Sequence, residues 1–344
     1  RKGVRTENKN KRVAARATAK TARRKTRATN LKGRIENKKA RGVETVSKGK
    51  VEKYYGKEII LTAGALVTPK ILMHSGIGDE DQLNKFGINI EENLVGVGKN
   101  LQDHHEVPFI TKAKPGYGYF KQNKGLRMIR NGIQYLLFKS GPVTSNGVDC
   151  CSFLNPDNLD NDIDPKIKLY CVQIMYTDRD TKNIKPDHGV TLTSCIMNPK
   201  SRGSVTLKSS NPLDLPNINP NFLSEQDDIN LFLDSLKLAR KVIKTKPLSD
   251  IITEELLPGK DITDDNMLID YCKKMIKTNW HPVGTCKMGA DNDNTAVLNS
   301  NLQVKGIKNL RVFDVSMMPN IVAANTNAPA MAIADLATDI MLEG

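Results

Sequence analysis

The fold of this chain is decided by the stretch Lys57-Glu58-Ile59-Ile60-Leu61-Thr62-Ala63-Gly64-Ala65-Leu66-Val67-Thr68-Pro69-Lys70-Ile71-Leu72-Met73. Residues 57–62 predict a short buried strand. Thr68 is expected to cap a helix that runs through Met73, with Pro69 at its first position. Small residues between a strand and a helix let another backbone or a cofactor approach closely. Many α/β proteins share this pattern, so it predicts a fold class and no particular function.

The segment before this stretch divides into a hairpin and a basic arm. Residues 40–46 and 51–55 flank a glycine-containing turn, which is typical of a β-hairpin. Residues 1–30 contain almost no large apolar side chain, and we expect regular structure to begin near residue 40. Such an arm could bind nucleic acid or an anionic membrane surface. No aromatic residue interleaves it to stack on bases, so a solvated, partly disordered stretch is the favoured interpretation.

Composition sets limits on the class of protein. The chain has 344 residues, enough for a large core and two lobes. Its net charge of +14 comes from one end, because residues 1–60 hold 21 Lys and Arg against five Glu. No apolar run approaches the roughly 18 residues of a membrane-spanning helix. The six cysteines show no C-x-x-C spacing. We therefore expect no metal site, no specific nucleic-acid partner and no transmembrane segment.

Residues 109–279 have a different pattern, in which short apolar runs alternate with turn residues before longer amphipathic segments. This composition predicts an antiparallel sheet with covering helices. The expected elements are strands over residues 167–175, 189–197 and 203–208, and helices over 128–138 and 228–244.

The run Trp280-His281-Pro282-Val283-Gly284-Thr285 contains the only tryptophan and one of five histidines. Histidine has a pKa that suits proton transfer near neutral pH. A histidine beside a tryptophan is nevertheless more often a packed core residue than a catalyst. Downstream, residues 310–316 predict a strand and residues 325–341 a last helix, with Thr326 or Asn327 as cap and Pro329 in its first turn.

Three motifs resemble one enzyme family. The run Gly64-Ala65-Leu66-Val67-Thr68-Pro69-Lys70-Ile71-Leu72-Met73-His74-Ser75-Gly76-Ile77-Gly78 resembles the second signature of the glucose–methanol–choline (GMC) oxidoreductases, which are FAD-dependent alcohol-oxidising enzymes. The loop Gly98-Lys99-Asn100-Leu101-Gln102-Asp103-His104 resembles the segment that follows that signature. The family pairs a histidine in H-x-x-G-T with a histidine or asparagine at the entrance to a helix. His281 and Asn325 occupy these positions here.

The resemblance implies an α/β (α+β) fold, in which the remainder of a Rossmann-like FAD-binding domain joins an antiparallel-sheet substrate domain covered by helices. The implied divisions are a basic, poorly matching segment (1–39), two parts of the FAD-binding domain (40–108 and 280–344, the second with the catalytic residues) and the substrate-binding domain (109–279). The residues expected against FAD are Ala63, Gly64, Asp314, Val315, Thr326 and Asn327.

The implied chemistry suits these residue types. Oxidation of an alcohol removes a proton from oxygen and a hydride from carbon. A neutral His281 could accept the proton as general base, an effect of roughly 10²–10⁴ in rate. Asn325 could orient the oxygen through its amide N–H, although a plain helix cap is its alternative role. The hydride needs a cofactor as acceptor, and the positive N-terminus of the last helix would stabilise reduced flavin.

The remaining titratable residues are given structural roles. His104 and His105 are expected to be structural, and His74 and His188 to be surface or packing residues. Nothing in the sequence argues for a reactive thiol at Cys286.

One departure from the family pattern concerns the cofactor. No G-x-G-x-x-G turn between a strand and a helix, the element that holds the FAD pyrophosphate, is found in the sequence. The simplest hypothesis is a truncated chain or partial gene model that corresponds to the C-terminal part of the family. We therefore expect this chain alone to bind FAD weakly or not at all. Stoichiometric flavin that co-purifies with the 344 residues would contradict this expectation.

Three functions remain open from sequence. The first is FAD-dependent oxidation of a primary or secondary alcohol, as in choline or glucose dehydrogenases. The second is a truncated, non-catalytic fragment or basic interaction protein. The third is a hydroxynitrile lyase-like member that uses flavin only structurally. The alcohol, the electron acceptor (oxygen or a quinone), the oligomeric state and the localisation do not follow from the sequence.

Overall fold

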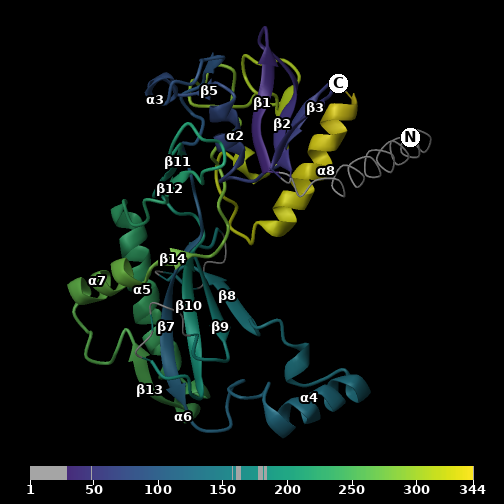
Figure 1. The fold of residues 1–344 in the computed structure, drawn as a ribbon. Coiled ribbons are helices and arrows are strands. Elements are labelled where there is room, and N and C mark those ends of the chain that lie inside the picture. Colours follow the sequence, from purple (N-terminus) through teal and green to yellow (C-terminus); the bar gives the residue numbers. More distant parts are fainter. Residues whose placement is uncertain are drawn as a thin grey trace.

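The computed structural model describes residues 29–343 except 48, 157, 160–163, 177–180, 182 and 183, and the basic arm before residue 29 lies outside it. The described residues form two lobes (Figure 1). One is built around a pair of parallel strands and is called here the parallel-strand lobe. The other, called the sheet lobe, is built on a six-stranded antiparallel sheet. This mixture of elements confirms the predicted fold class.

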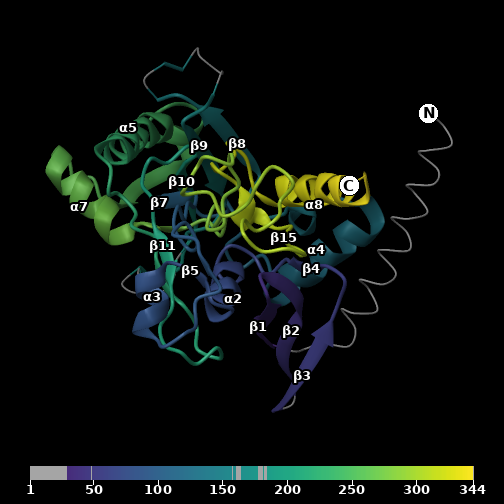
Figure 2. The ribbon, with the colours of Figure 1, turned by 90° about the horizontal axis from the view of Figure 1, so that it is seen from above.

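The parallel-strand lobe joins the two ends of the described chain. Strand β4 (Ile59–Leu61) pairs in parallel with β15 (Leu310–Val312). As predicted, β4 leads through small residues into helix α2 (Thr68–His74), all of whose residues are buried. Leu61, Leu72 and Val312 meet in one apolar core, and burying such side chains stabilises the lobe by about 1.5–3 kcal/mol each. Helix α8 (Asn327–Glu343) lies beside this core (Figures 1 and 2).

The predicted role of Thr68 as a helix cap is wrong. Val67 occupies the cap position, and Thr68 is the first residue of α2. The hydroxyl of Thr68 instead donates to Asp314 Oδ2 at 2.6 Å and accepts the N–H of Ala63 at 3.1 Å. A threonine one position inside the helix thus ties the end of β4 to the segment that follows β15.

A three-stranded antiparallel sheet flanks this lobe. It contains β1 (Thr29–Glu36), β2 (Lys39–Ser47) and β3 (Lys50–Tyr55) in that order. The hairpin β2–β3 confirms the sequence prediction. The expectation that regular structure begins near residue 40 is wrong, because β1 pairs with β2 along its whole length. The sequence of β1 is rich in polar residues, so its pairing depends on β2 rather than on an apolar pattern of its own.

The sheet lobe contains β13 (Ile252–Leu257), β7 (His105–Ala113), β10 (Gly189–Ile196), β9 (Ile167–Val172) and β8 (Cys150–Leu154) in that spatial order, with β14 (Lys277–Thr278) also on β7. Helices α5 (Gln226–Ile243) and α7 (Asp265–Met275) cover one face (Figure 1). Phe109, Phe232 and Leu236 pack in the core between the sheet and α5. Lys168 of β9 and Glu106 of β7 lie at one level of the sheet, on either side of Cys195 of β10.

One predicted strand lies outside the substrate-domain sheet. Strand β11 (Ser204–Thr206) pairs with β12 (Asn217–Asn219) in a separate two-stranded sheet, so the predicted strand over 203–208 does not join the substrate-domain sheet. Val205 N–H donates to Gly98 O at 2.7 Å, which attaches this hairpin to the parallel-strand lobe. The division proposed at residue 108 falls inside β7, which is one continuous strand.

The remaining elements are short or peripheral. They are β5 (Ile77–Gly78), α3 (Glu80–Lys85), β6 (Glu92–Asn93), α4 (Gly125–Phe138), η1 (Pro142–Thr144), α6 (Leu248–Ile251) and η3 (Val315–Met317). In the described part of the chain, no helix combines the length and apolar character needed to cross a bilayer.

Candidate active site

The segment 100–104 holds the loop that carries His281. Gln102 and Val283 exchange backbone hydrogen bonds of 3.1 and 2.9 Å. The backbone N–H of His281 donates to Asp103 Oδ1 at 3.0 Å, and the hydroxyl of Thr278 donates to Asp103 Oδ2. Two motifs far apart in the sequence therefore form one unit, in which a buried carboxylate binds the backbone of His281 and the side chain of Thr278, on the two sides of Trp280.

The same segment also holds the chain that leads to Asn325. The side chain of Gln102 donates to Pro319 O at 3.0 Å and accepts the N–H of Ile321 at 3.1 Å. Asn100 Nδ2 donates to Gly284 O and to Pro319 O at 3.2 and 3.1 Å. Because buried polar groups require partners, these bonds fix the approach of both predicted catalytic residues.

Glycine is required at position 284 of the H-x-x-G-T motif. Gly284 has φ +90°, and a Cβ there would lie 2.6 Å from Asn100 O. A side chain would face both an unfavourable backbone conformation and a collision with backbone. Gly284 thus allows the His281 loop to lie directly against the segment 100–104.

Gly284→Ala is expected to lower the free energy of unfolding by more than the roughly 1–2 kcal/mol of the positive φ alone. Gly87→Ala is the matched control, because Gly87 has φ +64° but open space around an added Cβ. The measurement is urea unfolding of both variants. Equal losses in the two would show that the contact between Gly284 and Asn100 does not constrain the loop.

His281 and His104 form a directed hydrogen-bonded pair. Their Nδ1 atoms are 3.0 Å apart, and His104 Nε2 lies 3.0 Å from Met197 O. A carbonyl oxygen can only accept, so His104 Nε2 carries the proton. The Nδ1 atom of neutral His104 is then an acceptor, and His281 Nδ1–H must donate to it. His281 Nε2 is therefore left as an unprotonated, basic nitrogen.

Burial keeps both rings neutral. It lowers the pKa of His281 to about 4, with a smaller effect from the charge of Lys168. Burial and the neighbouring His281 lower the pKa of His104 to about 3. A neutral histidine has a nitrogen lone pair that can accept a proton, and a pKa of about 4 makes that nitrogen a weaker base than in a free histidine. His104 is buried and hydrogen-bonded, as expected of a structural residue, and one of its two partners is the ring of His281.

Asn325 lies at the entrance to α8, two residues before the helix begins. Lys168 Nζ donates to Asn325 Oδ1 at 3.1 Å. This contact identifies the oxygen of the carboxamide, so its N–H groups are the donors that remain for another ligand. Lys168 was not among the residues predicted for the site, because a lone lysine in a predicted strand belongs to no catalytic motif.

A cavity of about 650 Å³ brings most of the predicted site residues together. His281 and Asn325 line it with five of the six residues expected at the cofactor, namely Ala63, Gly64, Val315, Thr326 and Asn327. The sixth, Asp314, lies behind this wall, where its carboxylate accepts the N–H of Gly64 at 2.9 Å. Asp314 therefore shapes the cavity from outside.

The cavity wall combines an open position at Gly64 with free backbone donors at the start of α8. Gly64 has φ +83°, and a Cβ there would meet no atom within 4 Å, so the wall is open at this point. The first backbone bond at the start of α8 runs from Ala330 N–H to Thr326 O at 2.9 Å. The N–H groups of Asn327 and Ala328 precede that bond, and such groups favour negative charge. These residues suit the pyrimidine edge of a flavin.

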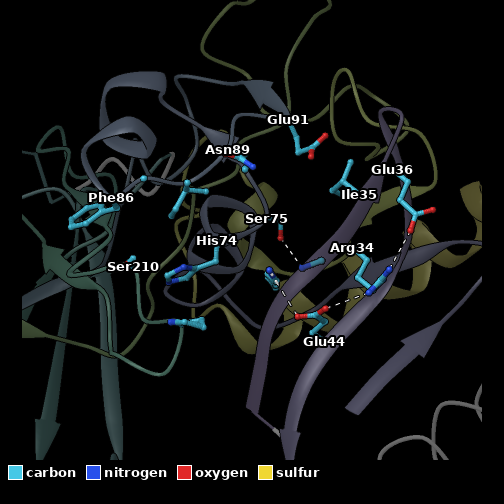
Figure 3. A pocket seen from close by; sticks show the side chains of 16 residues that line it. Arg34, Ile35, Glu36, Glu44, His74, Ser75, Phe86, Asn89, Glu91 and Ser210 are labelled. Atoms are coloured by element: carbon cyan, nitrogen blue, oxygen red, sulfur yellow. Dashed lines mark hydrogen bonds and ion pairs between the residues drawn. The ribbon is translucent and has the colours of Figure 1, made fainter. Parts of the chain in front are cut away.

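A second cavity, of about 670 Å³, shares no lining residue with the first. It lies between β1 and the end of α2 (Figure 3). Its charged side chains pair with one another, since Arg34 contacts Glu44 at 3.4 Å and Glu36 at 3.3 Å. Ser75 Oγ accepts the N–H of Gly33 at 2.7 Å. These ion pairs and this hydrogen bond are internal to the protein, and Arg34 Nε is buried without a hydrogen-bond partner.

The other residues given structural roles are found as follows. His105 is buried, stacks on Phe222 and lies 3.9 Å from Asp228. His74 is buried on α2, and His188 Nδ1 contacts Tyr117 O at 2.9 Å. The Cys286 thiol is fully buried, which raises its pKa. Within the described ranges, no three His, Cys, Asp or Glu side chains gather as metal ligands.

Comparison with known proteins identifies the family. Models of the GMC oxidoreductase family match residues 2–106 with their N-terminal part and residues 199–334 with their C-terminal part. The N-terminal match includes the basic segment before residue 40. The chain belongs to the GMC oxidoreductases, a family of oxidoreductase enzymes.

Curated relatives agree with this assignment. The chain is 35% identical to an alcohol dehydrogenase [acceptor] of Pseudomonas putida, over 90% of this chain and 56% of the relative. It is 34% identical to an oxygen-dependent choline dehydrogenase of Photobacterium profundum, over 90% of this chain and 54% of that protein. The chain is also 34% identical to human mitochondrial choline dehydrogenase, over 92% of this chain and 53% of that protein. The chain thus spans about half the length of these relatives.

Solved structures share the fold. Formate oxidase of Aspergillus oryzae superposes with a TM-score of 0.82 at 26% identity, over 91% of this chain and 59% of that one. Pyridoxine 4-oxidase from Mesorbium loti superposes with a TM-score of 0.80 at 26% sequence identity, over 92% of this chain and 57% of that one. The formate oxidase carries FAD, and FAD is the cofactor of the fold family to which this chain belongs.

Proposed function

We propose that the protein to which this chain belongs oxidises an alcohol to a carbonyl compound with FAD as cofactor. The observation that supports this most is the single cavity lined by His281, Asn325 and the start of α8. The relatives named as alcohol and choline dehydrogenases support the same reaction class.

The roles of the residues follow from their contacts. The alcohol hydroxyl donates its proton to His281 Nε2, the nitrogen that the bond to His104 leaves bare. Asn325 donates an amide N–H to the same oxygen, because its own oxygen is occupied by Lys168. Ala63, Gly64, Val315, Thr326 and Asn327 line the same cavity and would hold the flavin ring. Bound flavin would supply the acceptor for the hydride from carbon.

His281 is arranged to act without a conformational change in its ring. The bond to His104 fixes the ring at Nδ1, and the bond to Asp103 fixes its backbone. A base held in the productive orientation avoids the entropy of positioning at the moment of reaction. The low pKa of His281, about 4, keeps the ring unprotonated at neutral pH.

The test is anaerobic mixing of the complete flavin-loaded protein with alcohols while flavin absorbance is recorded. We expect a primary or secondary alcohol to bleach the oxidised flavin in a single turnover. If no alcohol reduces the flavin, while a cyanohydrin is cleaved to a carbonyl compound and cyanide, the lyase alternative would replace the oxidation proposed here.

A further inference from the structure

A buried lysine lies on the polar face of the sheet lobe beside the candidate site. Lys168 on β9 is only 6% exposed. In the sheet it lies opposite Cys195 of β10, which in turn lies opposite Glu106 of β7. Its ammonium reaches Asn325 Oδ1 at 3.1 Å and lowers the pKa of His281 through its charge. Lys168 is not among the residues that line the 650 Å³ cavity, but it contacts Asn325, which does line it, and acts on His281 through its charge.

The nearby carboxylates are engaged by other groups. Glu106 accepts the hydroxyl of Tyr170 at 2.5 Å and lies opposite Lys277 in the sheet. Asp103 accepts the N–H of His281 at 3.0 Å and the Thr278 hydroxyl. In the part of the chain that the structure describes, no carboxylate oxygen lies within 4.0 Å of Lys168 Nζ. Its one hydrogen-bond partner there is the neutral carboxamide of Asn325.

An ammonium in this position discriminates between ligands by charge. A buried charge is costly unless it is paired, and a charged hydrogen bond to a carboxylate is about twice as strong as a neutral one. A lysine has three N–H donors, of which the contact with Asn325 uses one. Lys168 interacts at longer range with Glu106, whose pKa is raised by burial and lowered in part by the Lys168 charge, and its ammonium lies 5.2 Å from the centroid of the Tyr170 ring. A ligand carboxylate that reaches Lys168 would add a direct charged hydrogen bond, whereas a cation would be repelled.

We propose that this site selects alcohols that carry a carboxylate and excludes quaternary-ammonium alcohols, with Lys168 as the specificity-determining residue. The inference rests on the proposed function for the location of the alcohol. It separates this chain from those of its relatives that are named choline dehydrogenases. The carboxylate binds the free N–H groups of Lys168, while the hydroxyl of the same molecule reaches His281 and Asn325.

The chain contains its own reporter for such binding. Trp280 is the only tryptophan, is 82% exposed and lines the same cavity as His281 and Asn325. Its fluorescence can be titrated with glycolate, ethylene glycol and choline, which all carry a primary hydroxyl but differ in charge. The measurement requires neither flavin nor turnover.

We expect the 344-residue chain to bind glycolate at least about tenfold more tightly than choline, a difference of about 1.4 kcal/mol. Lys168→Met removes the charge with little change in length and is expected to abolish this preference. Ethylene glycol should be affected less than about twofold, because it has no charge to pair. Lys200→Met, at an exposed position outside the cavity, is the control and should retain the preference.

Two results would overturn the proposal. One is choline binding as tightly as glycolate, or no response to glycolate up to about 100 mM in a folded chain. The other is an unchanged preference in Lys168→Met. The proposed function is judged separately by flavin reduction in the complete protein. If choline reduces the flavin and glycolate does not, the charge selection is rejected and the oxidation of alcohols stands. If binding is charge-selective but no alcohol reduces the flavin, the oxidation is rejected and the charge selection stands.

Discussion

His281→Gln in the complete, flavin-loaded protein is expected to slow alcohol-dependent flavin reduction by about 10²–10⁴-fold. The variant keeps a polar side chain of similar size but has no basic nitrogen at neutral pH. In the structure, His281 is the group whose Nε2 stays bare because Nδ1–H is bound to His104. Its pKa of about 4 means that the wild-type ring is neutral over the physiological range.

The measurement is the single-turnover rate of flavin bleaching under anaerobic conditions with saturating alcohol. The matched control is His188→Gln, because His188 contacts Tyr117 O and lines neither cavity described above. A reduction rate in His281→Gln within a few-fold of the wild type would remove His281 from the role of general base.

His104→Leu is expected to lower the same rate by about tenfold to a hundredfold, although His104 is assigned no contact with the alcohol. Removal of the acceptor leaves His281 Nδ1–H without its partner, so the ring can rotate or adopt the other tautomer. Misplacement of a catalytic group by about 1 Å can cost about a hundredfold in rate. His104 is thus a positioning residue.

A conservative variant separates orientation from simple loss of packing. In His104→Gln, the side chain offers both an acceptor for His281 and a donor for Met197 O. We expect it to recover part of the rate lost in His104→Leu while thermal stability is similar in the two. Equal rates in His104→Leu and the wild type would show that the contact between the two rings does not serve the reaction.

The local sequence predicted the secondary structure around the site well. The strand at Ile59, the following helix and the hairpin after residue 39 were found because their apolar pattern and turn residues are local properties. Strand β1 was missed because its polar sequence becomes a strand only through pairing with β2. The predicted cap at Thr68 was wrong because its hydroxyl binds Asp314 across the fold.

The site residues also fall into those that local sequence predicts and those that only long-range contacts show. The family motifs brought His281 and Asn325 to attention, and the structure places them on one cavity. The roles of His104 and Lys168 depend on contacts between residues separated by 177 and 157 positions. A single sequence gives no signal for such contacts. Residues 100–104 were noticed as a motif, but only the hydrogen bonds show that they hold the segments that carry His281 and Asn325.

The presentation of a bare Nε2 of His281 to the cavity can be tested on the chain alone by ¹⁵N NMR of the histidine side chains. We expect His281 to carry its proton on Nδ1, to have an unprotonated Nε2 at neutral pH and to titrate with a pKa of about 4. A proton on Nε2, or a charged ring at neutral pH, would contradict it.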